Sequence, residues 1–149
     1  TIPSATVSAG TVYVPSNGLT ALKPGADSVE QLWNSGNISP ATSSPVVAGN
    51  LALVLNSSGV LNAASLETGE RVWQLRLRGT FSGTPIYARD HLYLVNEAGV
   101  AFVVKPEADK GTIVSELDLG ETILCSPGAS NGGLFIRSDS NLIKLAAPK

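Results

Sequence analysis

The sequence repeats itself about every 40 residues, and this repeat restricts the possible folds more than any other feature. Residues 44–47 (SPVV) align with residues 84–87 (TPIY) and 126–129 (SPGA), so that the prolines lie 40 and 42 residues apart. A fourth copy, residues 5–14, begins 40 residues before Pro45 with alanine at the proline position. Periods of about 20 to 50 residues are typical of solenoids, propellers and related arrays.

Each copy has the same internal order of strands and turns. The proline segment is followed by an apolar strand, a turn that ends in Gly18, Gly59 or Gly99, a second apolar strand, another turn and a last strand. Asn141 takes the glycine position in the fourth copy. Apolar residues do not follow a helical spacing over three turns in any segment, whereas β-formers cluster in short runs. We therefore predict an all-β chain with four short antiparallel strands per repeat, which is the pattern of a β-propeller blade.

The repeat also assigns positions within a blade. The proline segments are expected to form short inner strands, and the apolar runs 51–54 and 92–95 to form strands buried on both faces between blades. Trp33 and Trp73 lie 40 residues apart and are expected on outer strands, each with its indole between two blades and its N–H on a loop carbonyl of the next blade. In the third copy residues 114–115 (VS) stand at the tryptophan position.

These residues resemble the PQQ-like (pyrroloquinoline-quinone-like) repeat. The second copy carries its elements in order, with residues 44–47, Gly59, residues 67–70 (ETGE) and the apolar-Trp pair at 72–73. The last segment, residues 134–145, is similar to the closing blade of bacterial propellers of the BamB type, which act in outer-membrane assembly. The resemblance covers essentially the whole chain.

The resemblance implies a domain organisation. We expect one partial propeller domain over residues 1–149, with blades at about 1–39, 40–79, 80–121 and 122–149, the last without its outer strand. In such propellers the N-terminus of the full chain supplies that strand, so the chain is expected to be the C-terminal half of an eight-bladed ring. The alternative is a homodimer in which two copies complete one ring.

The resemblance also implies a function. We expect a non-catalytic scaffold for protein interaction or assembly, exported to the periplasm or the outer membrane of a bacterium. The alternative is the structural half of a quinone-dependent dehydrogenase, or of another enzyme whose site lies in other sequence. Quinone enzymes of this kind carry an adjacent Cys-Cys pair and a calcium site, and this chain has the single cysteine Cys125. No catalytic, cofactor-binding or metal-binding residue is predicted here.

Composition narrows the class of partner. Ten Lys and Arg residues against twelve Asp and Glu give a net charge of −2 without a run of like charges, which argues against nucleic acid. The longest apolar runs have about five residues, far fewer than the ~20 of a membrane-spanning helix, so no transmembrane segment is predicted. A protein partner or self-association remains the expected interaction.

Three arginines form the candidate partner-binding surface. Arg76 and Arg78 are expected to alternate on one strand and share a face, and Arg137 is the third member. The alternative is a solvated strand edge protected by charge. His91 is expected in a surface turn, and Cys125 is expected to be a small buried side chain. Ordinary turn positions are expected for Asp27, Asp90, Asp109 and Asp139.

Overall fold

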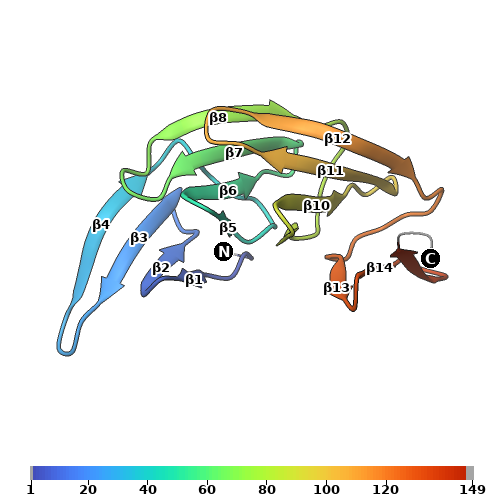
Figure 1. Ribbon diagram of the computed structural model, residues 1–149. Coiled ribbons are helices and arrows are strands. Elements are labelled where there is room, and N and C mark those ends of the chain that lie inside the picture. The colour runs from blue at the N-terminus through green and yellow to red at the C-terminus, as the bar shows by residue number, and fades with distance from the viewer. Residues whose placement is uncertain (1, 147–149) are drawn as a thin grey trace.

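In the computed structural model the described residues, 2–146, form fifteen β-strands in four antiparallel sheets. The sheets stand side by side as a fan, with the outer strands along its convex side (Figure 1). This arrangement confirms the predicted all-β fold of propeller blades. Residues 2–146 contain no helix with the length and apolar character needed to cross a membrane.

Each sheet is a meander whose strands follow the order of the chain. The first sheet consists of β1 (Thr6–Ser8), β2 (Thr11–Val14), β3 (Leu19–Pro24) and β4 (Val29–Ser35). The second consists of β5 (Val46–Ala48), β6 (Leu51–Leu55), β7 (Val60–Ser65) and β8 (Arg71–Arg76). The third consists of β9 (Ile86–Ala88), β10 (His91–Val95), β11 (Val100–Pro106) and β12 (Gly111–Asp118). Within the described residues the fourth has three strands, β13 (Gly128–Ser130), β14 (Gly133–Arg137) and β15 (Leu142–Ala146).

The middle of the second sheet is apolar because the first and third sheets cover its two faces. All five residues of β6 are buried, which confirms the prediction for residues 51–54. The inner strands β5 and β9 begin directly after Pro45 and Pro85, where a missing N–H removes no ladder hydrogen bond.

A β-bulge recurs at one position of the outer strand in each of the first three sheets. In the first two sheets Ala21 pairs with Trp33 and Ala63 with Trp73, and the extra residue of the bulge precedes each tryptophan. In the third sheet Val103 pairs with Ser115 at the same place. The register therefore confirms that Ser115 occupies the tryptophan position of its blade.

Each tryptophan joins its sheet to the next one. The Trp33 indole N–H donates to the carbonyl oxygen of Leu66 at 2.8 Å, and that of Trp73 donates to Glu107 at 2.9 Å. Both side chains are only 8% exposed. A Cβ atom added to Gly69 would lie 2.5 Å from Cε3 of Trp33, and one added to Gly111 would lie 2.7 Å from Cζ3 of Trp73. The predicted indole contact between blades is confirmed, and we call it the Trp–Gly contact.

A second repeated contact joins the inner ends of the blades. The backbone N–H of Ser4 donates to Oγ of Ser44 at 3.0 Å, and the N–H of Ser44 donates to Oγ1 of Thr84 at 2.9 Å. The N–H of Thr84 in turn donates to Oγ of Ser126 at 2.8 Å. Each of the three hydroxyl acceptors, Ser44, Thr84 and Ser126, directly precedes a proline. The three hydrogen bonds together connect all four sheets, and we call this series the ladder.

Removing one hydroxyl from this ladder is expected to weaken the fold measurably. Thr84→Val keeps the shape of the side chain but leaves the N–H of Ser44 without its acceptor, so we expect a loss of about 1 kcal/mol in the free energy of unfolding. Thr84→Ser should restore most of it, because serine serves at the other two acceptor positions. Urea unfolding followed by circular dichroism measures both variants. Equal stability of wild type and Thr84→Val would contradict a role for the ladder.

The apolar core lies between the sheets, and the number of buried residues differs from one interface to the next. Among the described residues, the cluster between the second and third sheets contains fourteen buried residues, including Trp73, Leu92 and Phe102. The cluster between the third and fourth sheets contains four: Val95, Ala101, Ile123 and Ile136. The third interface is therefore the least filled, and it is the one that has Ser115 in place of tryptophan.

Candidate partner-binding site

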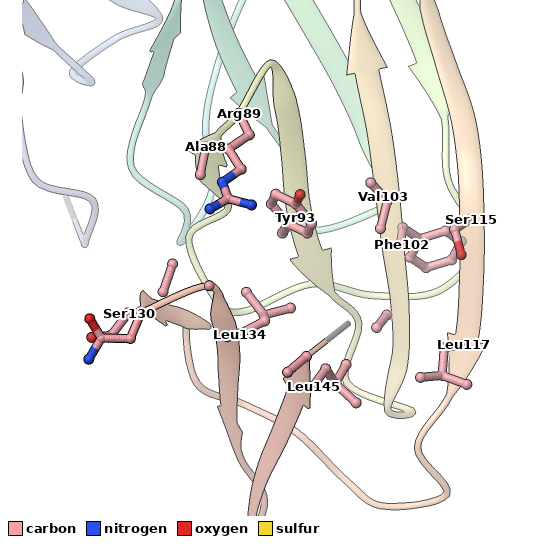
Figure 2. Close-up of a pocket in the computed structure, with 16 residues that line it drawn as sticks. Ala88, Arg89, Tyr93, Phe102, Val103, Ser115, Leu117, Ser130, Leu134 and Leu145 are labelled. Atoms are coloured by element: carbon pink, nitrogen blue, oxygen red, sulfur yellow. The ribbon is translucent and has the colours of Figure 1, made fainter. Parts of the chain in front are cut away.

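A cavity of about 750 Å³ lies between the third and fourth sheets (Figure 2). Tyr93, Val103 and Leu117 line it from the third sheet, and Leu134 and Leu145 line it from the fourth. Most of this wall is apolar, and a site of this size and character can hold a side chain or a short apolar segment.

Two features of the chain leave this space open. Ser115, which lines the cavity, replaces the large indole that fills the two preceding interfaces. Within residues 2–146 no strand covers the outer edge of β15, which forms part of the opposite wall. The Trp–Gly contact that joins the first sheet to the second and the second to the third therefore has no counterpart between the third and fourth sheets in residues 2–146.

The turn at the inner end of the cavity is strained. Arg89 and Asp90 join β9 to β10 with φ angles of 49° and 60°, in the left-handed region that costs non-glycine residues about 1–2 kcal/mol each. The equivalent turn of the fourth sheet has Asn131 and Gly132, which suit this geometry. The Arg89 side chain borders the cavity and is exposed (Figure 2). It has no ion-pair partner in the described part of the chain.

Asp90 in the same turn influences a neighbouring tyrosine. The Tyr87 hydroxyl donates to Oδ1 of Asp90 at 3.3 Å. Burial raises the pKa of the Tyr87 phenol above its ordinary value of 10.0, and the negative charge of Asp90 raises it further. Tyr87 therefore stays neutral at physiological pH, and the carboxylate of Asp90 accepts the hydrogen bond from its hydroxyl group.

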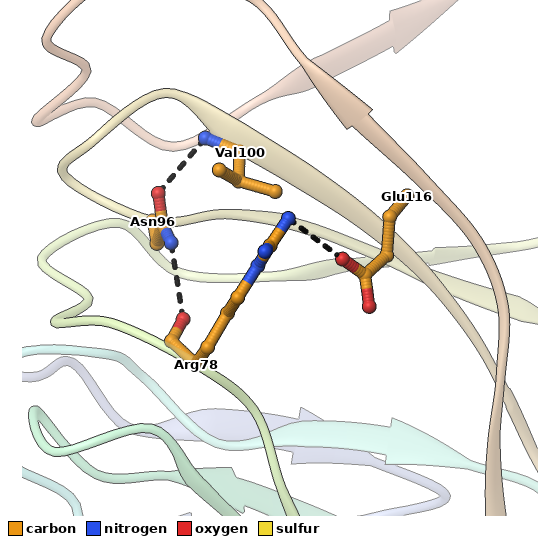
Figure 3. Close-up of polar contacts among 4 residues, drawn as sticks. All are labelled: Arg78, Asn96, Val100 and Glu116. Atoms are coloured by element: carbon orange, nitrogen blue, oxygen red, sulfur yellow. Dashed lines mark hydrogen bonds and ion pairs between the residues drawn. The ribbon is translucent and has the colours of Figure 1, made fainter.

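Arg76 and Arg78 do not lie on one strand, so that part of the prediction is wrong. The strand β8 ends at Arg76, and the N–H of the next residue, the buried Leu77, donates to the carbonyl oxygen of Gly59 at 2.8 Å. Arg78 lies beyond the strand, where its guanidinium is 2.9 Å from Oε2 of Glu116 on β12 (Figure 3). Arg78 therefore joins the second sheet to the third.

Arg137 lies far along the chain from the other two arginines, at the end of β14 in the fourth sheet. Its carbonyl oxygen accepts a hydrogen bond from Sγ of Cys125 at 3.0 Å. Cys125 is half-buried and packs against the cluster between the third and fourth sheets, so the predicted burial is only partial. The three arginines are thus spread over the second and fourth sheets and the segment that follows β8.

The polar contacts around Arg78 differ in how much they are expected to contribute. Asn96 is only 2% exposed, accepts from the N–H of Val100 at 2.8 Å and donates to the carbonyl oxygen of Arg78 at 3.0 Å (Figure 3). Asn96→Ala should lower the free energy of unfolding by about 2 kcal/mol, because it leaves buried polar groups unpaired. Arg78→Ala removes an exposed ion pair and should cost less than about 1 kcal/mol. Chemical denaturation ranks the two variants, and a larger loss for Arg78→Ala would contradict the ranking.

The aspartates lie in the turns or bends between strands, as predicted: Asp27, Asp90, Asp109 and Asp139. His91, which was predicted in a surface turn, lies instead at the start of a strand, directly after such a turn. His91 is the first residue of β10, and its Nδ1 is 2.8 Å from the carbonyl oxygen of Arg89. In residues 2–146 no three or more His, Cys, Asp and Glu side chains are grouped so that they could hold a metal ion.

Comparison with known proteins was made by sequence and by structure. The family model described as "Outer membrane protein assembly factor BamB" matches residues 16–114. A solved structure, that of BamB from Moraxella catarrhalis, is similar with a TM-score of 0.74 and 16% sequence identity, over 97% of this chain and 44% of that chain. This likeness concerns the fold, and the chain spans less than half the length of that protein. No curated protein matches the sequence.

Proposed function

Since this chain belongs to the family of PQQ-like β-propellers described as the outer membrane protein assembly factor BamB, we propose that it is a protein-interaction scaffold that acts in assembly in the bacterial cell envelope. The place of action would be the periplasm or the periplasmic side of the outer membrane.

The cavity between the third and fourth sheets is the observation that supports this proposal most directly. It has apolar walls from Leu117, Leu134 and Leu145, and it is lined by Ser115, which stands where the two preceding interfaces have tryptophan. A rigid array of sheets with one unfilled interface is well suited to hold a partner segment, because little of the scaffold must be ordered on binding.

The organisation of the complete molecule is part of the proposal. The following remain predictions: one partial domain, with blade limits near residues 39, 79 and 121. Two alternatives remain for the complete ring, either eight blades in one longer chain or a homodimer of two copies. The structural neighbour is more than twice as long as this chain, which supports a ring that includes further blades.

Cross-linking in cells tests the proposed function. A photoreactive amino acid at Leu117, in the cleft, and another at Val29, on the exposed outer strand of the first sheet, give a matched pair in the full protein. We expect the Leu117 position to cross-link to outer-membrane assembly proteins in the source bacterium and the Val29 position to do so much less. Recovery of the protein in the cytoplasmic fraction, with no envelope protein attached at either position, would contradict the proposal.

A further inference from the structure

We propose that Asn131 is a modification site, at which the side-chain amide is converted spontaneously to a carboxylate through a cyclic imide with the backbone nitrogen of Gly132. This conversion depends on the chemistry of the chain itself and not on the proposed function.

The sequence contains two Asn-Gly pairs, and the residue types alone do not distinguish them. Asn17 and Gly18 lie between β2 and β3, and Asn131 and Gly132 lie between β13 and β14. A glycine after asparagine favours closure of the imide ring, because no side chain stands next to the attacking nitrogen. Both asparagines are exposed, and both have left-handed φ angles, of 53° at Asn17 and 47° at Asn131.

The packing of the two glycines does distinguish the pairs. Gly18 is buried, and a Cβ atom added to it would overlap the carbonyl oxygen of Ser35 and lie 2.8 Å from Cα of Gly36. Gly132 is exposed, and an added Cβ atom there would meet no atom within 4 Å. The backbone that follows β4 therefore restricts rotation of the Asn17–Gly18 peptide, whereas the Asn131–Gly132 peptide is free to rotate when its turn opens.

The open turn is a property of the repeat and does not depend on the position of the fourth sheet in the chain. Gly10 and Gly49, at the same turn of the first and second sheets, are also exposed and also have no atom within 4 Å of an added Cβ. The second sheet has this open turn although neighbouring sheets cover both of its faces. By contrast, Gly59 and Gly99, at the turn equivalent to that of Gly18, each approach a backbone carbonyl oxygen closely.

The reaction requires water as its only co-reactant. When the turn opens, the backbone nitrogen of Gly132 loses its proton to base and attacks Cγ of Asn131, and the bond between Cγ and Nδ2 breaks. The side-chain nitrogen leaves as ammonia after it takes up a proton. Water then opens the imide and restores the N–H group of Gly132. Attack of water at Cγ gives aspartate, and attack at the backbone carbonyl carbon gives isoaspartate, in which the main chain runs through Cβ and Cγ.

The two products differ in their effect on the hairpin of β13 and β14. Aspartate keeps the main chain unchanged and tolerates the left-handed conformation as asparagine does. Isoaspartate adds an atom to the main chain of a two-residue turn, so Ser130 and Gly133 are not expected to keep their pairing. Either product adds a negative charge to the wall of the cavity, where Arg89 is the one charged side chain among the described lining residues.

Peptide mapping by mass spectrometry tests the site in the folded 149-residue chain, incubated at mildly alkaline pH. Cleavage after Lys110 and Arg137 gives a peptide in which Asn131 is the single asparagine. We expect Asn131 to be converted at least about tenfold faster than Asn17, a ratio equivalent to ~1.4 kcal/mol in activation free energy. Both the aspartate and the isoaspartate peptide should appear, and chromatography separates them. Equal rates at the two sites, or faster conversion of Asn17, would overturn the inference.

The same chain unfolded in urea is the matched control, because neither glycine is then packed. The two rates should become similar, and a difference that persisted in urea would show that the packing of Gly18 is not its cause. Hydrogen exchange checks the effect on the hairpin. Asn131→Asp should retain the protection of β13 and β14, whereas the isoaspartate form should lose it; equal protection in the two would overturn the expected change of pairing.

Discussion

Replacing Trp73 with alanine is expected to lower the free energy of unfolding by about 3 to 5 kcal/mol. The indole is almost fully buried in the cluster between the second and third sheets and faces Gly111. Alanine leaves a cavity there and also removes the hydrogen bond to the carbonyl oxygen of Glu107. Urea unfolding followed by far-ultraviolet circular dichroism measures the loss without relying on the fluorescence of the removed residue.

Two further substitutions, one at the same residue and one next to it, serve as controls for this result. Trp73→Phe keeps an aromatic ring but loses the indole N–H, so its cost should be clearly smaller than that of Trp73→Ala. Val72→Ala changes the exposed bulge residue next to it and should fall within about 0.5 kcal/mol of wild type. If Trp73→Ala were no more destabilising than Val72→Ala, the indole would not be what joins the two sheets.

The second large effect is expected on the glycine side of the same type of contact. Gly69→Ala should cost about 2 to 4 kcal/mol, because the residue has a φ angle of 73° and the new methyl group would lie 2.5 Å from Cε3 of Trp33. A ring held by a hydrogen bond to Leu66 has little freedom to move aside. The same unfolding measurement applies.

Gly132→Ala is a closely matched control for Gly69→Ala. Gly132 has the same φ angle of 73°, but an added Cβ atom would meet no atom within 4 Å. Its cost should therefore be the backbone strain alone, about 1–2 kcal/mol. The difference between the variants measures the Trp33 contact, and it should shrink in a Trp33→Ala background. Equal costs at the two glycines would show that Trp33 does not pack on Gly69.

The repeat made most of the fold predictable, because each blade is a short meander with its own turn residues. The period also places Trp33 and Trp73 at equivalent positions, which was enough to predict that each indole reaches the next blade. The position of Arg78 was not predictable in the same way. The strand β8 ends at Arg76, and Arg78 lies beyond it in a segment that follows the buried Leu77, so the alternation of a strand no longer applies there.

The candidate site was only partly visible in the sequence. Alignment of the copies placed Ser115 at a tryptophan position, and this was the available signal for an unfilled interface. The cleft itself depends on the distance between two sheets, and its lining comes from segments 57 residues apart, such as Ala88 and Leu145. The strain at Arg89 and Asp90 is likewise a backbone property, which the residue types alone do not reveal.

Hydrogen exchange followed by NMR tests most directly the central claim, that a buried tryptophan joins the first sheet to the second and the second sheet to the third. The indole N–H groups of Trp33 and Trp73 should both exchange slowly, because each is buried and donated to a carbonyl of the next sheet. Indole exchange as fast as in an unfolded peptide would contradict the account.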